Sequence, residues 1–133
     1  NDSKIRFPQL TEFCLVDIQR VVDYFERLQT EICQTLETFD GQSSFSLEEI
    51  DTPGGGHSRP RVLDAGAHIE RGAVQFTHSI GAALPPAASE RNPHLAGKGF
   101  QAAAISMIMH PQNPWVPTFH ATLRFFLIDD ENW

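Results

Sequence analysis

The sequence predicts an α+β domain in which one long N-terminal helix packs on an antiparallel β-sheet. Three observations predict this fold: an amphipathic stretch comes first, alternating stretches follow it, and no further helical stretch separates them. Successive strands without helices between them pair antiparallel, because parallel neighbours need connections of a dozen or more residues. A length of 133 residues suits one core, so we expect residues 1–133 to form a single domain.

The helix is expected over residues 11–39. Asp40-Gly41 then gives a stop signal. Cys14 and Cys33 both fall in this stretch, about 28 Å apart along a helix, whereas a disulfide needs Cα atoms closer than about 7 Å. We therefore expect free thiols that act as small core residues in a reducing compartment. The apolar side chains that recur at steps of three and four, or their sums, are Leu15, Ile18, Val22, Phe25, Ile32 and Leu36.

Residues 42–61 are expected to form a loop, because serines and a Pro-Gly-Gly-Gly run interrupt any periodic pattern. The glycines at 54–56 fit two interpretations. They could form a flexible linker, or they could bring backbone N–H groups close to an anion.

Alternation and length predict strands in the second half of the chain. Prolines and glycines make residues 82–99 a second loop, and the proline-rich stretch 111–117 connects the last two strands. That connection is too short for a crossover, so these two strands should form an antiparallel hairpin. The expected strands are 67–70, 74–80, 101–110 and 118–129.

The charge balance argues against nucleic acid as a partner, since 17 acidic residues outnumber 10 basic ones and the formal charge is −7. A small anion could still bind local arginines, with Arg59, Arg61 and Arg124 as candidates. No run of 18 apolar residues is present, so we expect no membrane span. The first ten residues lack the apolar centre of a signal peptide, which favours a cytoplasmic protein, or an organellar one if a targeting segment has been removed.

The predicted hairpin gathers polar side chains on one face. Alternation places Ser106 with His110 on one strand, and His120 with Thr122 and Arg124 on the other. Such a group could bind a carboxylate through arginine and move protons through histidine. Two histidines alone do not make a zinc signature, so a metal site, ordinary sheet histidines and a non-metal site all stay open. His57, His68, His78 and His94 add no motif spacing.

The stretch from His110 to Phe126, His-Pro-Gln-Asn-Pro-Trp-Val-Pro-Thr-Phe-His-Ala-Thr-Leu-Arg-Phe-Phe, resembles a family signature. Oxygen-dependent coproporphyrinogen III oxidases have H-P-x-N-P-x-x-P-T-x-H-x-N-x-R-[FY]-F, and only Thr122 departs from it. The resemblance covers roughly residues 25–133. Its further segments are Leu28–Cys33, Asp40-Gly41, Gly54–Leu63, Glu70–His78 and Ala104–Met109.

The resemblance implies oxidative decarboxylation of two propionates of coproporphyrinogen III, giving protoporphyrinogen IX in haem biosynthesis. Molecular oxygen would be the co-substrate, without an organic cofactor, in a homodimer whose broad sheet is flanked by helices. His120 matches the family's proposed proton donor. His110 and His120 match the divalent-metal ligands proposed for some bacterial members. The implied substrate-binding positions are Ser106, Thr122, Leu123 and Arg124.

Several departures from the family pattern predict a divergent or weakened member. Thr122 and Gln75 replace asparagines, Pro60 is inserted, and the Trp-x-Arg before the glycine-rich loop has no match. The sequence stops where the family continues into Trp-Phe-Gly-Gly-Gly-x-Asp-Leu, so we expect the N-terminal half of the enzyme, with little activity alone. The alternatives are a non-catalytic tetrapyrrole-binding module, and one subunit of a split enzyme.

Overall fold

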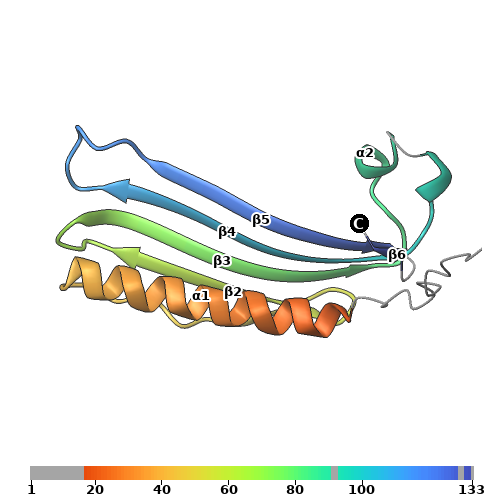
Figure 1. The fold of residues 1–133 in the computed structure, drawn as a ribbon, viewed down its shortest axis with the longest axis horizontal. Coiled ribbons are helices and arrows are strands. Elements are labelled where there is room, and N and C mark those ends of the chain that lie inside the picture. Colours follow the sequence, from red (N-terminus) through yellow and green to blue (C-terminus); the bar gives the residue numbers. More distant parts are fainter. Residues whose placement is uncertain (1–16, 91–92, 129–130, 133) are drawn as a thin grey trace, which may run out of the picture.

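The computed structural model describes residues 17–90, 93–128 and 131–132. It shows one long helix packed on an antiparallel sheet whose strands follow each other in chain order, β1-β2-β3-β4-β5-β6, so the predicted α+β fold is confirmed. Figure 1 shows α1 lying along one side of the sheet. The elements are α1 (Ile18–Asp40), β1 (Ile50–Thr52), β2 (Gly56–Asp64), β3 (Ile69–Gly81), α2 (Pro86–Ser89), the 3₁₀ helix η1 (Pro93–Leu95), β4 (Phe100–Pro111), β5 (Phe119–Ile128) and β6 (Glu131–Asn132).

The ends of α1 follow from local capping. The Asp17 carboxylate accepts a hydrogen bond from the Gln19 N–H at 2.9 Å, which satisfies one of the free donors of the first turn. At the other end Gly41 takes a φ of 70° and donates its N–H to the Glu37 carbonyl. The predicted stop at Asp40-Gly41 is confirmed, whereas residues 11–16, with Cys14, lie outside the described part of the chain.

The core lies between α1 and one face of the sheet. The buried Val22 and Phe25 of α1 belong to the same cluster as Val74 and Phe76 of β3 and Ile105 of β4. These strand residues alternate with half-exposed neighbours, as expected for a sheet covered on one side only. Among the described helices, none combines the length and apolar character needed to cross a membrane.

Asp40 connects the end of α1 to the turn between β2 and β3. Its buried carboxylate accepts hydrogen bonds from four backbone N–H groups. These bonds, led by those from His68 and Ile69, hold the pKa of Asp40 well below its usual range. The other two donors are Ala67 and Ser43.

The loop predicted over residues 42–61 is wrong in its second part, which contains β1 and most of β2. The glycine run forms the turn between these strands, with Gly54 and Gly55 at φ 89° and 94°, so it is not a linker. Pro60 fits inside β2 because its nitrogen faces the outer edge of the strand. Val62, two residues further on, directs its backbone groups to Ser46 rather than to β3, and alternate residues point the same way.

The strands expected at 67–70 and 74–80 are a single strand, β3, with a register shift between Ile69 and Arg71. Gly72 lies inside this strand, where a Cβ would lie 2.7 Å from the Met109 sulfur. The predicted loop 82–99 holds the short helices α2 and η1. The predicted hairpin is confirmed as β4 and β5, and Asp129 lies outside the described residues.

Candidate functional site

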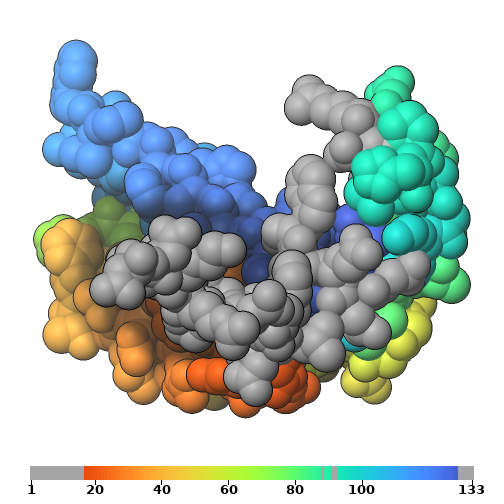
Figure 2. Space-filling view, turned by 45° about the vertical axis from the view of Figure 1, so that its right-hand side comes forward, coloured from red at the N-terminus to blue at the C-terminus, as the bar shows by residue number. Residues whose placement is uncertain are grey.

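The face of the sheet opposite α1 is open and hollowed. The hollow has a volume of about 390 Å³, which falls within the usual range for small-molecule sites, about 300–1,000 Å³. Figure 2 shows the surface hollowed between β5 and the segment that contains α2 and η1. The lining side chains are Gln75, Thr77 and Ser79 of β3, Phe100, Ala102, Ala104 and Ser106 of β4, and Thr122 and Arg124 of β5.

Ser106 lies in the middle strand and contacts two of the predicted site residues. Its cross-strand partners are Gln75 on β3 and Thr122 on β5. The Ser106 hydroxyl oxygen is 2.9 Å from the Thr122 hydroxyl oxygen and 3.5 Å from Nε2 of His120. One hydroxyl group can therefore accept from one of these neighbours while it donates to the other.

Arg124 is the one cationic side chain among the described residues that line the hollow. Its guanidinium carbon lies 5.9 Å from the centroid of the Phe126 ring, a distance at which a cation–π contact restrains the side chain. Ala104 is its partner on β4. Because the side chains of Ala104 and Ala102 are small, the β4 surface beside the guanidinium, called here the alanine floor, leaves room for a ligand.

The two histidines of the signature share the face with the hollow but do not line it. His120 is exposed and pairs with Ile108 on β4. His110 lies nearer the tip of the hairpin, with Nδ1 3.3 Å from the Thr118 hydroxyl oxygen. The hairpin thus brings His120 next to Ser106 and Thr122, and places Arg124 further along β5 and His110 nearer the tip.

Leu123 differs from the other predicted substrate-binding residues in its orientation. Alternation along β5 turns its side chain to the face on which α1 packs, where it is 53% exposed. A contact between Leu123 and a ligand in the hollow would therefore have to use its backbone.

The hairpin offers two candidate ligands for the predicted divalent metal, His110 and His120. Structural zinc sites need four ligands, and catalytic sites take about three from the protein. Within the described ranges, no three His, Cys, Asp or Glu side chains gather in a way that could hold a metal. Among the described residues, the hairpin therefore supplies two of the ligands that such a centre needs, and metal binding stays a prediction. Cys33 lies on the buried face of α1, and burial raises its pKa to about 11, so the group is a thiol at neutral pH.

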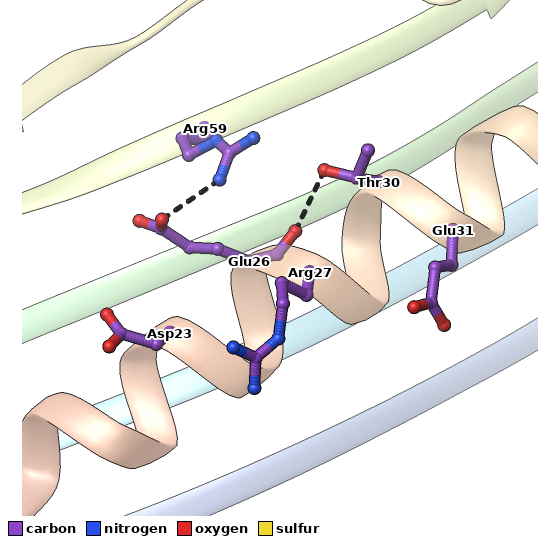
Figure 3. Close-up of a pocket in the computed structure, with 6 residues that line it drawn as sticks. All are labelled: Asp23, Glu26, Arg27, Thr30, Glu31 and Arg59. Carbon is purple, nitrogen blue, oxygen red and sulfur yellow. Dashed lines mark hydrogen bonds and ion pairs between the residues drawn. The ribbon is translucent and has the colours of Figure 1, made fainter.

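The other candidate anion ligands, Arg59 and Arg61, lie on the opposite side of the sheet. Arg59 pairs with Glu26 at 3.2 Å, and both line a shallow hollow beside α1 (Figure 3). Arg61 is buried and donates to the backbone carbonyls of Glu48 and Pro60. Of the three arginines, only Arg124 faces the open hollow.

Sequence reasoning missed the contribution of β3 to this site. Gln75, Thr77 and Ser79 alternate with the buried Val74, Phe76 and His78, so their shared face was already visible in the pattern. The missing information was which strand would pair with β4, because that decides which polar row borders Ser106.

The hollow and the signature residues belong to one matched region. A family model described as Coproporphyrinogen III oxidase matches residues 20–133, which include every strand and nearly all of α1. The expected family is thereby confirmed: the chain belongs to the coproporphyrinogen III oxidase family.

Proposed function

We propose that this chain provides the substrate-binding face of an oxygen-dependent coproporphyrinogen III oxidase. The observation that supports this most is that Ser106, Thr122 and Arg124 line one hollow, with His120 beside them. A tetrapyrrole with propionate arms needs a broad open face and at least one cation. This sheet face offers both, and its small alanine floor leaves the centre free.

The chemistry proposed here removes carbon dioxide and, formally, a hydride from a propionate, leaving a vinyl group. Molecular oxygen accepts the two electrons and two protons and becomes hydrogen peroxide. Arg124 binds a carboxylate through its guanidinium fork. His120 acts as the proton donor, and the Ser106 hydroxyl, 3.5 Å from Nε2, helps to orient its ring.

An anaerobic binding measurement followed by an oxygen pulse tests this proposal. Without oxygen, coproporphyrinogen III should bind the chain and stay unchanged. After the pulse, carbon dioxide and a vinyl product should form only slowly, well below about 1 per second, because we expect the chain to have little activity alone. His120→Gln should keep binding within about threefold and slow the product step by about 10² or more, as for loss of a general acid. His68→Gln is the matched control, because this exposed histidine lies in the turn between β2 and β3.

The outcomes separate the oxidase from the alternatives. Binding without product would favour a non-catalytic tetrapyrrole-binding module, or a segment that needs further catalytic groups. Absence of binding would refute the proposed site. A homodimer and a divalent metal at His110 and His120 belong to the same proposal. Light scattering measures the molar mass and so tests the homodimer. Product formation after treatment with a chelator tests the divalent metal.

A further inference from the structure

Gln75 lies at the β3 side of the hollow. It lies on β3 directly opposite Ser106, which in turn lies opposite Thr122 on β5. Its side chain is exposed and lines the cavity, so it can contact a ligand without any rearrangement of the sheet.

The hydrogen bonds of neighbouring hydroxyl groups determine which end of the Gln75 amide faces the ligand. The Ser58 hydroxyl donates its one proton to the Phe76 carbonyl, at 3.3 Å. The Ser58 oxygen can then only accept, and it does so from Nε2 of Gln75 at 3.1 Å. The second hydrogen of Nε2 points to the Thr77 hydroxyl oxygen at 3.4 Å.

The free end of this amide is therefore its carbonyl oxygen, Oε1. Both hydrogens on Nε2 are engaged, and no described residue donates a hydrogen bond to Oε1. An ionised carboxylate offers no proton, so the propionates are not its partner. A ligand group that pairs with Oε1 must instead be an N–H or O–H group above the β3 side of the hollow.

We propose that Oε1 of Gln75 accepts a hydrogen bond from a pyrrole N–H, and that this bond makes the site prefer reduced tetrapyrroles to oxidised ones. The inference rests on the proposed function, because it takes coproporphyrinogen III as the ligand. In a porphyrinogen the saturated bridging carbons let each pyrrole ring tilt, so its N–H can point out of the macrocycle plane. In an oxidised porphyrin the N–H groups lie in the plane and point to the ring centre, out of reach of an acceptor below it.

The spacing of the site fits such a ligand. Arg124 and Gln75 lie on strands separated by β4, and neighbouring strands are about 4.8 Å apart, which gives about 10 Å across the sheet. Gln75 also lies two residues along β3 from Thr77, which shares a row with Arg124, so the two anchors are about 12 Å apart. A propionate arm on Arg124 therefore leaves the macrocycle over the alanine floor, with its N–H groups toward Gln75.

The test compares the binding of two ligands with the same four propionates, coproporphyrinogen III and coproporphyrin III, both measured without oxygen. The variants are Gln75→Met, which keeps the length of the side chain and removes the acceptor, and Gln34→Met, an exposed position on α1. We expect Gln75→Met to bind the reduced ligand about two- to tenfold more weakly, which corresponds to one neutral hydrogen bond, and the oxidised ligand unchanged. Gln34→Met should bind both ligands as the unmodified chain does.

Ser58→Ala provides a second measurement, because it removes the group that holds the amide in place. It should reduce the preference for the reduced ligand less than Gln75→Met does. The inference is overturned if both ligands bind the unmodified chain and Gln75→Met weakens the binding of both equally or changes the binding of neither. The proposed function would still stand in that case. If neither ligand binds the unmodified chain, both are overturned.

Discussion

Arg124 is the residue whose replacement gives the clearest prediction about binding. A guanidinium fork makes two charge-assisted hydrogen bonds to a carboxylate, and each is worth about 1.5–3 kcal/mol. Arg124→Lys keeps the charge and one of these bonds. Because Arg124 is exposed, we take the lower value, about 1.5 kcal/mol, which predicts roughly tenfold weaker binding of coproporphyrinogen III. Arg124→Met also removes the coulombic attraction, about 1 kcal/mol at 4 Å in water, and should weaken binding at least about fivefold further.

The assay is an anaerobic titration at two salt concentrations. The unmodified chain should lose affinity as salt rises, and Arg124→Met should lose part of that dependence, since screening acts on the pair it removes. Arg71→Lys is the matched control, because Arg71 pairs with Asp64 at 3.1 Å and does not line the hollow. Equal affinity for the Arg124→Lys variant and the unmodified chain, or an equal loss in Arg71→Lys, would show that Arg124 does not bind the propionate through a fork.

Three further predictions concern stability and reactivity. The ionised Asp40 carboxylate stabilises the fold above about pH 4, and this stabilisation is lost as the pH falls toward the lowered pKa that Asp40 has in the folded chain. Asp40→Asn should therefore lower the urea midpoint at pH 7 and differ less from the unmodified chain at pH 3. An equal difference at both pH values would contradict this. Phe76→Ala, at a side chain with 0% exposure, should cost about 3–5 kcal/mol in urea unfolding, whereas Phe39→Ala, 63% exposed, should cost about 1 kcal/mol or less. In a Cys14→Ser background, Cys33 should resist thiol reagents at pH 8 until the chain is unfolded, because burial raises its pKa to about 11; fast native labelling would refute that.

Periodicity and turn chemistry were enough to predict the elements that build the hairpin site. The end of α1 follows from Asp40-Gly41, and β4 and β5 follow from their length and from the prolines between them. The hairpin connection then allows only antiparallel pairing, which places Ser106 beside His120 on one face. These features are local in the sequence, and so a single sequence predicts them.

The features that escaped prediction depend on contacts between distant segments. Pro60 and the glycine run indicate a loop locally, yet β2 accepts them because its outer edge needs few ladder hydrogen bonds and its turn needs positive φ angles. The gap expected between strands 67–70 and 74–80 is absent, because β4 pairs with β3 along both segments. In each case the deciding neighbour lies far away along the chain.

The two asparagine positions of the family pattern that differ here are neighbours in space. Gln75 and Thr122 flank Ser106 on either side, in one row across β3, β4 and β5. In the sequence they lie far apart and look like unrelated changes, a lost amide at Thr122 and a longer amide side chain at Gln75. In the structure, the row keeps one amide, on β3, and gains on β5 a hydroxyl that bonds to Ser106 at 2.9 Å. The pair therefore redistributes the polar groups around Ser106, and a double change to Gln75→Asn with Thr122→Asn should disturb ligand binding less than Thr122→Asn alone. If the change in binding free energy of the double variant equals the sum of the two single changes in the anaerobic titration, the two positions act independently and this prediction fails.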